Sequence, residues 1–208
     1  MKDSNISKKI VEGLVSKKLN SIIEIGPGMG ILTQHLINSK TKTYFIEIDK
    51  ESITYLNNVF PEIKDSIINE DFLKIDLGQF KAPIGLIGNF PYNISSQILF
   101  KLIENREKIE ELVGMFQFEV AKRICAPPGS KTYGILSVLV QAFYSAEFLF
   151  ALSPHHFNPP PKVNSGVIKL TKKNTQFLDC DEKLFFKVVK TSFQQRRKTL
   201  RNSLKSFN

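Results

Sequence analysis

The segment from residue 87 to 95, IGNFPYNIS, places an amide, a rigid imino acid and an aromatic ring where an apolar strand ends. The side-chain carbonyl of Asn89 and the backbone carbonyl of Pro91, held by its stiff ring, can accept both hydrogens of one exocyclic amine. The ring of Tyr92 offers a flat face to a purine. Two acceptors would aim the poorly nucleophilic nitrogen of adenine at an electrophile, so these residues predict catalysis by positioning and electrostatics.

A glycine-rich turn precedes this segment, with the spacing Gly26-x-Gly28-x-Gly30. Glycines allow a positive φ and let the backbone approach a ligand closely. A dinucleotide site would have glycine at the position of Ile31. The observed spacing is that of S-adenosylmethionine-dependent methyltransferases, in which the turn accommodates the methionine portion. A tight strand-to-helix turn without a ligand is the alternative.

Two acids follow the glycine turn at the ends of later apolar runs. Glu47, next to Ile48, can accept the two ribose hydroxyls of a cofactor, although dehydrogenases place an acid in the same way. Asp71 can accept from the exocyclic amine of an adenine, and Phe72 can pack on the ring. Taken singly, each acid could equally be a solvated loop residue.

Apolar runs alternate with helical patterns over the first hundred residues, so the chain is expected to build an α/β fold with a parallel sheet and helices on both faces. The glycines, both acids and residues 89–92 all follow predicted strands, and such ends share one edge of a parallel sheet, where ligands bind. The predicted strands are 21–25, 43–48, 66–69, 84–88, 112–118, 148–152 and 165–170. The predicted helices are 6–19, capped by Ser4 or Asn5, 31–37, 50–59, one from Glu119, and 133–143.

Composition restricts the class of protein further. The chain has 208 residues and a formal net charge of +9, which favours a polyanionic partner and nucleic acid before membrane. It has no apolar run near the roughly 18 residues of a membrane span and no signal-peptide core, so we expect a cytoplasmic protein. The three histidines and two cysteines lack metal-ligand spacing, and no metal is expected.

A base within a helix cannot reach such a site, so the target must be single-stranded or flipped out, and it then lies between aromatic or apolar faces. Phe157 begins a segment with three consecutive prolines, which forms a stiff loop. It is a candidate for the face opposite Tyr92. A loop residue packed onto the core is the alternative.

Six motifs in order resemble the ribosomal RNA adenine dimethyltransferases, and specifically the small-subunit branch. They are EIGPGMGILTQHL, FIEIDK, NEDFL, GNFPYNIS, FNPPPKVNSGV and FQQRRKTLRNSL. The resemblance implies a Rossmann-like S-adenosylmethionine-dependent methyltransferase domain and the start of a small C-terminal helical domain. It also implies dimethylation at N6 of two adjacent adenosines in a 3′-terminal hairpin loop of 16S rRNA, coupled to small-subunit maturation.

The resemblance also assigns roles to residues. Gly26, Gly28, Glu47, Ile48, Asp71, Phe72 and Asn89 would border S-adenosylmethionine. Asn89, Pro91, Tyr92 and Phe157 would hold the target adenine. Arg196, Arg197, Lys198 and Arg201 lie in a basic run without an acid and would contact RNA phosphates, although a solvated helix face is the alternative reading.

The expected organisation is a methyltransferase domain over residues 1–175 and a basic, RNA-contacting helical unit over 176–208. The family's helical domain is longer, so this unit is expected to be its N-terminal part. Met1-Lys2-Asp3 stands where the family usually has Gln-x-Phe-Leu-x-Asp, a segment that helps to close over the cofactor. Phe90 replaces the more usual Leu or Ile and should fit a buried site. We expect a monomer whose partner is small-subunit rRNA in an immature 30S-type subunit.

Three alternatives fit parts of the same pattern. A large-subunit rRNA adenine methyltransferase shares the cofactor motifs and an Asn-x-Pro-Tyr, but residues 133–138 and 195–204 look like the small-subunit branch. An RNA-binding assembly factor with weak or lost catalysis would not need the intact segments 26–30 and 89–92. A nicotinamide-dependent oxidoreductase is disfavoured by Ile31 in the glycine pattern.

Overall fold

The computed structural model describes residues 3–14, 18–174, 178–194 and 198–207. Within them, seven strands form one sheet in the order β3-β2-β1-β4-β5-β7-β6. The strands are β1 (Ser21–Ile25), β2 (Lys42–Glu47), β3 (Ile67–Asn69), β4 (Ile84–Asn89), β5 (Ile109–Gln117), β6 (Tyr144–Leu152) and β7 (Ser165–Lys172). The α-helices are α1 (Ser4–Glu12), α2 (Thr33–Leu36), α3 (Lys50–Val59), α4 (Ser95–Glu104), α5 (Phe118–Ile124), α6 (Ile135–Phe143), α7 (Glu182–Gln194) and α8 (Leu200–Ser203). Short 3₁₀ helices are η1 (Pro61–Ser66), η2 (Leu77–Gln79), η3 (Pro154–His156) and η4 (Lys205–Phe207).

The sheet is mixed rather than wholly parallel. Strands β3, β2, β1, β4 and β5 run parallel, as the alternation of strands and helices predicts, whereas β7 pairs antiparallel with both β5 and β6. The predicted strand 148–152 is too short, since β6 begins at Tyr144, directly after α6. An antiparallel return needs no crossover helix, and for that reason the second half of the chain lacks the regular alternation of the first.

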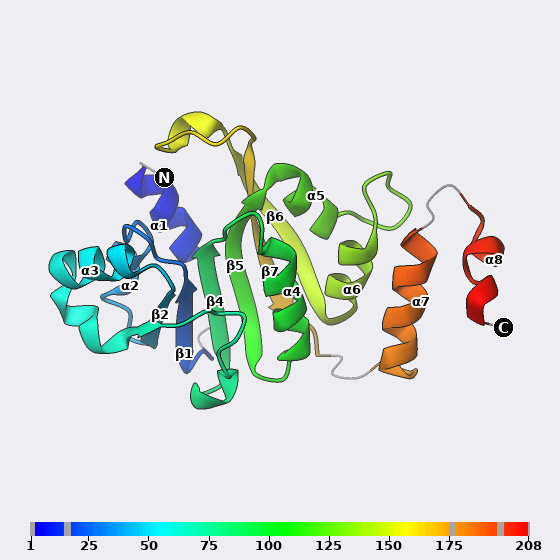
Figure 1. Ribbon diagram of the computed structural model, residues 1–208, viewed down its shortest axis with the longest axis horizontal. Coiled ribbons are helices and arrows are strands. Elements are labelled where there is room, and N and C mark those ends of the chain that lie inside the picture. The colour runs from blue at the N-terminus through cyan, green and yellow to red at the C-terminus, as the bar shows by residue number, and fades with distance from the viewer. Residues whose placement is uncertain (1–2, 15–17, 175–177, 195–197, 208) are drawn as a thin grey trace.

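Helices cover both faces of the sheet, so two separate groups of buried apolar side chains form. One group includes side chains from α4, α6 and α7, and the other includes side chains from α1, α2 and η1. Figure 1 shows the strands in the middle of the molecule, with α3 at one end and α7 and α8 at the opposite end. The parallel strands are therefore buried on both sides, which fits their nearly continuous apolar sequences.

The strand order brings the predicted site residues to one edge. Strand β1 lies between β2 and β4, and the chain leaves it at Gly26. Glu47 is the last residue of β2, and Asn89 is the last residue of β4. Because these three strands are parallel neighbours, the glycine turn lies between the acid and the amide, as the sequence predicts.

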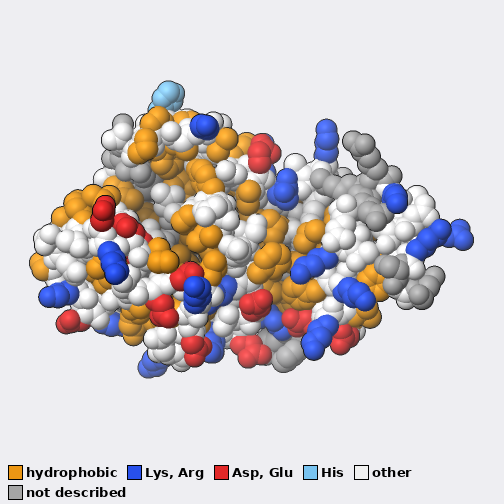
Figure 2. Space-filling view, in the orientation of Figure 1, with side chains coloured by type: hydrophobic (Ala, Val, Ile, Leu, Met, Phe, Trp, Pro, Cys, Tyr) orange, Lys and Arg blue, Asp and Glu red, His pale blue; other side chains and the backbone are white. Residues whose placement is uncertain are grey.

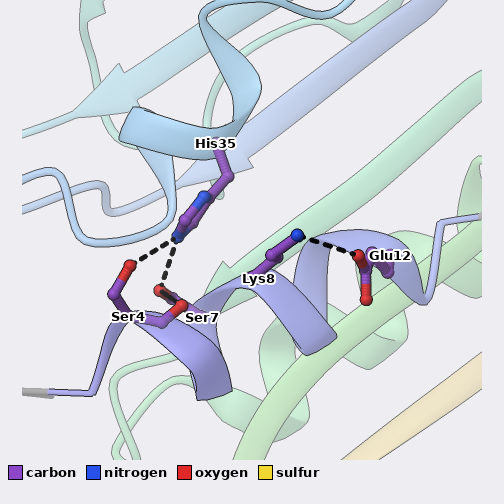
Figure 3. Close-up of polar contacts among 5 residues, drawn as sticks. All are labelled: Ser4, Ser7, Lys8, Glu12 and His35. Carbon is purple, nitrogen blue, oxygen red and sulfur yellow. Dashed lines mark hydrogen bonds and ion pairs between the residues drawn. The ribbon is translucent and has the colours of Figure 1, made fainter.

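The N-terminal helix α1 is shorter than predicted and is capped by a different residue. The Asp3 side chain accepts from the backbone N–H groups of Asn5 and Ile6, so neither Ser4 nor Asn5 is the N-cap. Figure 3 shows His35 of α2 reaching α1, with its Nε2 atom 2.9 Å from the Ser7 hydroxyl. At the other end, Lys169 donates to the Gly13 carbonyl at 2.8 Å and pairs with the buried Glu111.

The C-terminal helix α7 packs on α6. The rings of Phe143 and Phe186 stack with their centroids 6.4 Å apart, and Arg106 forms a two-pronged ion pair with Glu182 at 3.1 and 2.7 Å. The predicted domain boundary at 175/176 lies outside the described residues. The sheet ends at Lys172 and α7 begins at Glu182, on either side of that boundary.

Candidate active site

The glycine turn after β1 leaves open space at two of its three glycines. Gly26 and Gly28 have φ angles of +65° and +55°, and no atom lies within 4 Å of a Cβ built on either residue. Gly30 is different, since its Cβ would lie 2.4 Å from the Phe60 ring. Gly26 and Gly28 therefore form an open backbone cradle suited to a ligand, whereas Gly30 allows the turn to pack on the protein.

Glu47 holds this turn in place. It is 7 % exposed, and its Oε2 atom accepts from the backbone N–H of Gly28 at 3.0 Å. Its Oε1 atom accepts from the N–H groups of Ile48 and Asp49 at 2.8 and 3.0 Å. Ile48, by contrast, is 66 % exposed although it is apolar, so it offers a surface that a bound heterocycle could cover. The predicted ribose acceptor is thus also the residue that orders the glycine backbone.

The loop after β3 carries Asp71 and Phe72 and is held by a lysine from α4. Asp71 is half-buried, and its Oδ1 atom accepts from the Leu73 N–H at 2.9 Å. The Lys101 ammonium donates to the carbonyls of Leu73 and Ile75 at 3.1 and 2.6 Å, and it lies 5.3 Å from the centre of the Phe72 ring. Burial lowers the pKa of Lys101.

The Phe72 ring is only 4 % exposed and belongs to the larger apolar core. It is therefore a floor residue rather than an open stacking face. Its contact with an adenine stays a prediction.

Asn89 and Phe90 have opposite environments. The Asn89 side chain is half-buried, and within the described part of the chain it makes no hydrogen bond. Phe90 is 1 % exposed, as predicted for this position, and its ring meets Phe116 edge to face at 5.0 Å. The ring fills a slot over two glycines paired across β4 and β5, because a Cβ at Gly88 or Gly114 would come within 2.6 or 2.1 Å of it. Phe90 thus anchors the loop while Asn89 stays available.

The backbone carbonyls of this loop differ in whether they are free to accept a hydrogen bond. The Pro91 carbonyl already accepts from the Ile94 N–H at 3.2 Å and from the Ser95 hydroxyl at 3.1 Å, so both of its lone pairs are used. The Phe90 carbonyl accepts no hydrogen bond from the residues that the structure describes. The free backbone carbonyl beside Asn89 is therefore that of Phe90, whereas that of Pro91 is occupied. Ser95, the first residue of α4, donates its hydroxyl back to the carbonyls of Pro91 and Tyr92.

The Tyr92 side chain is hydrogen-bonded to β7, in the antiparallel part of the sheet. Its hydroxyl lies 2.8 Å from the hydroxyl of Ser165, the first residue of β7, which is fully buried. Ser165 pairs with Gln117 on one side and Leu152 on the other, so it is fixed by three strands. The direction of the Tyr92 ring is thereby set by a residue that the sequence pattern did not single out.

The Phe157 side chain is nearly buried. Phe157 is 7 % exposed and packs in the apolar group beneath α1 and α2, so it has the environment of the alternative reading, a loop residue on the core. Its role as a second stacking face remains a prediction.

In the basic run, Lys198 and Arg201 are exposed, the latter on α8, whereas Arg196 and Arg197 lie outside the described residues. Figure 2 shows Lys and Arg side chains gathered over α7 and α8.

A buried acid near the cradle was not predicted either. Glu24 on β1 is 1 % exposed and accepts from the Thr33 hydroxyl at 2.8 Å. Burial raises the pKa of Glu24, the hydrogen bond from Thr33 lowers it and the nearby Glu47 raises it, to about 8 in all. At neutral pH this carboxyl is therefore largely protonated, which lets a second acid lie behind Glu47 without a second negative charge. The acid within the apolar strand SIIEI was the signal for it in the sequence.

The open glycine cradle, the acid that orders it and the unbonded amide lie on neighbouring strands. These residues fit S-adenosylmethionine, since Gly26 and Gly28 leave room for a ligand that a Cβ would obstruct. Figure 2 shows hydrophobic side chains around a hollow between the α3 end and the middle of the molecule. This fold and this site define an S-adenosylmethionine-dependent methyltransferase.

The family model described as ribosomal RNA adenine dimethylase matches residues 1–208, and the chain belongs to this family. It is 57 % identical to ribosomal RNA small subunit methyltransferase A of Flavobacterium johnsoniae, over 100 % of this chain and 80 % of that protein. It is 56 % identical to the protein of the same name from Cytophaga hutchinsonii, over 100 % and 82 % of the two chains. The chain is thus an enzyme that uses S-adenosylmethionine and acts on ribosomal RNA.

Solved structures agree with the fold. A dimethyladenosine transferase from Plasmodium falciparum superimposes with a TM-score of 0.85 at 31 % identity, over 98 % of this chain and 74 % of that one. The 23S rRNA methyltransferase ErmE superimposes with a TM-score of 0.81 at 24 % identity, over 98 % of this chain and 82 % of that one. At this identity the likeness is evidence for the fold only. The predicted Rossmann-like methyltransferase fold is confirmed.

The described ranges offer neither a metal centre nor a membrane span. They contain no group of three or more His, Cys, Asp or Glu side chains that could hold a metal ion. They also contain no helix both long and apolar enough to cross a membrane.

Proposed function

We propose that this chain dimethylates N6 of two adjacent adenosines in a 3′-terminal hairpin loop of small-subunit rRNA during maturation of that subunit. The observation that carries the proposal is the side chain of Asn89, which bonds to none of the described residues and lies one strand away from the open cradle of Gly26 and Gly28. The names of the relatives from Flavobacterium and Cytophaga support the small subunit as the target.

The cofactor would lie along the carboxyl edge of β1, β2 and β3. Gly26 and Gly28 would admit its amino-acid portion, Glu47 would accept from its ribose, and Ile48, Asp71 and Phe72 would surround its adenine. When bound, S-adenosylmethionine supplies an electrophilic methyl carbon on a positively charged sulfur. No histidine or metal is needed for this chemistry.

The loop of residues 89–92, which we call the catalytic loop, would hold the target amine. The Asn89 side-chain carbonyl and the Phe90 backbone carbonyl would accept its two hydrogens, which draws the nitrogen lone pair out of conjugation with the purine ring. Tyr92 would stack on the base, and the Ser165 hydroxyl would keep that ring in one orientation. Pro91 would stiffen the loop, and Phe157 would approach the opposite face of the base.

The rest of the molecule would bind the surrounding RNA. We infer a methyltransferase domain over 1–175 and an RNA-contacting helical unit over 176–208, in which Arg196, Arg197, Lys198 and Arg201 neutralise phosphates. The partner would be an immature 30S-type subunit, read largely by shape. The protein would act in the cytoplasm as a monomer, without metal or membrane.

Radiolabelled transfer distinguishes this proposal from its alternatives. The chain is incubated with labelled S-adenosylmethionine and small subunits that lack these methyl groups, and the labelled nucleotides are mapped. Label on two neighbouring adenosines of one loop supports the proposal. Label only on large subunits, tested in parallel, would indicate the large-subunit activity instead. Subunit binding without label would indicate an assembly factor.

A further inference from the structure

A second cavity lies beside the catalytic loop, where α4, the end of α5, the start of α6 and α7 meet. Its volume is about 360 Å³, which is within the range of small-ligand sites. Ser96, Phe100, Arg123, Ile135, Leu136 and Phe193 line it. None of these residues belongs to the site assigned above. We call this cavity the flanking pocket.

The walls of the flanking pocket are apolar and aromatic, but its surroundings are cationic. Phe100 has the Lys190 ammonium 5.5 Å from its ring centre, and Phe193 meets the Tyr133 ring edge to face at 6.0 Å. Arg123 is exposed, and its guanidinium makes no ion pair or hydrogen bond with the residues that the structure describes. Aromatic walls with cations beside them are the features that bind an unstacked nucleotide.

The wall formed by α5 and α6 is rigid before any ligand binds. The Ser137 hydroxyl accepts from the Gly134 N–H and donates to the Arg123 carbonyl. The Gln141 amide donates to the carbonyls of Ile124 and Ala126, both at 2.8 Å. These bonds satisfy carbonyls at the end of α5, so the backbone that carries Arg123 cannot shift freely. A preformed wall lowers the ordering cost of binding.

The flanking pocket is directly linked to the catalytic loop. Ser96 lies in the first turn of α4, next to Ser95, whose hydroxyl donates to the carbonyls of Pro91 and Tyr92. One helical turn thus separates the residues that would hold the target base from the rim of the pocket. When the target base of an RNA strand is flipped out into the active site, the adjacent nucleotide would lie near the rim of the flanking pocket.

We propose that the flanking pocket binds the unstacked base of a nucleotide next to the target adenosine, with Arg123 and Lys190 at the neighbouring phosphates. This inference rests on the proposed function, because it takes the substrate to be a single-stranded loop. It adds a subsite: the enzyme holds two bases at once, one for methylation and one that sets the register of the RNA. A loop with two adjacent targets could then be read in two registers by the same pair of sites.

Binding of short RNA hairpins tests the subsite without the reaction. Fluorescence anisotropy would compare an intact loop with one that has an abasic residue beside the target adenosine. Loss of one stacked base should weaken binding to the unmodified protein about tenfold. Phe100→Leu removes an aromatic wall for the base, so it should weaken binding of the intact loop and have little effect on the abasic one. Arg123→Ala removes a phosphate contact that the abasic RNA keeps, so it should weaken binding of both RNAs. Lys122→Ala is the matched control for Arg123→Ala, since it removes the adjacent charge of the same helix and should weaken binding of both RNAs less.

The contrary results are equally specific. If Phe100→Leu costs the same for both hairpins, if Arg123→Ala costs no more than Lys122→Ala, or if the abasic residue costs nothing in the unmodified protein, the subsite is refuted. Failure of the proposed function would be seen separately, as unmodified protein that transfers no label to small subunits. A refuted subsite would leave that label on both adenosines.

Discussion

The two sides of the cleft use the same small residue in opposite ways. On the cofactor side, Gly26 and Gly28 adopt positive φ angles and face empty space. On the base side, Gly88 and Gly114 leave a slot that the Phe90 ring fills completely. One pair of glycines makes room for a ligand, and the other makes room for a side chain of the protein itself. The cofactor side is thus built from backbone and open volume, and the base side from an anchored loop.

This difference shows how the enzyme can hold two substrates with different demands. A cofactor bound mainly through backbone N–H groups and carboxylates needs close approach, which bare glycine backbone allows. A poorly nucleophilic amine needs acceptors fixed to within a fraction of an ångström, which a buried ring and two hydroxyl bridges provide. Substitutions on the two sides should therefore separate cofactor affinity from methyl transfer.

Loss of the amine acceptor should have the largest effect. Asn89→Ala should lower kcat by about a hundred- to a thousandfold, because the side-chain carbonyl acts only on the reacting nitrogen. Calorimetry should find S-adenosylmethionine affinity nearly unchanged. Asn93→Ala, an exposed amide in the same loop, is the control and should transfer methyl groups normally. Substantial transfer by Asn89→Ala would remove the role assigned to this residue.

Filling the slot beneath Phe90 should have the next largest effect. Gly114→Ala places a Cβ 2.1 Å from the ring, so the loop must move and unfolding free energy should fall by about 1–3 kcal/mol. Transfer should fall with it, while cofactor affinity holds. Adding Phe90→Leu should restore much of both, since the shorter side chain leaves room for the methyl group. Thermal unfolding and single-turnover kinetics would measure the cycle, and additive losses would contradict the slot.

Substitution in the glycine cradle should have the opposite effect and weaken cofactor binding. Gly28→Ala should weaken S-adenosylmethionine binding at least tenfold, because the new methyl group occupies the open space. Its positive φ should also cost about 1–2 kcal/mol of stability. Gly129→Ala is a matched control, with φ +84° and no atom within 4 Å, in the loop before α6. It should lose similar stability without any change in cofactor affinity; equal affinity losses in both variants would mean that strain alone explains the effect.

The smallest effect on activity is expected at Glu24, where the signal is in stability. Its pKa is near 8 when folded and 4.5 ordinarily, so the folded state takes up a proton between these values. Stability should therefore fall as pH rises from about 5 to 8, by at most about 1.4 kcal/mol per unit from this group. Glu24→Gln should flatten that slope in urea unfolding, whereas Glu62→Gln, at an exposed acid, should leave it unchanged. An unchanged slope in Glu24→Gln would show that the buried carboxyl does not titrate there.

Local patterns in the sequence predicted local structure well. The helix at 50–59 and the strand at 21–25 have the predicted bounds, because each has a clear period and clear stop signals. The positions of Gly26, Glu47 and Asn89 followed from strand ends, and parallel pairing of β2, β1 and β4 brings them together. These predictions needed only the rule that parallel strands share one edge.

Features that depend on distant pairs were not predictable in the same way. The tie between Tyr92 and Ser165 spans 73 residues, and the pairing of Gly88 with Gly114 depends on which strands become neighbours. The Pro91 carbonyl, predicted as the second acceptor, is bonded within its own turn, because the turn geometry and not the residue type decides which carbonyl stays free. Phe72 and Phe157 illustrate the same limit, since an aromatic residue in a loop can equally well face the core.

Helix α4 joins the two halves of the cleft in a way that matters for their motion. It starts beside Ser95, which bonds to the catalytic loop, and about 9 Å further along it carries Lys101, which bonds to the loop of Asp71. The helix therefore connects the loop on the base side to the loop on the cofactor side. We therefore expect a ligand that orders the loop at one end of α4 to restrict the loop at its other end, so that each substrate would reduce the entropy lost when the second binds.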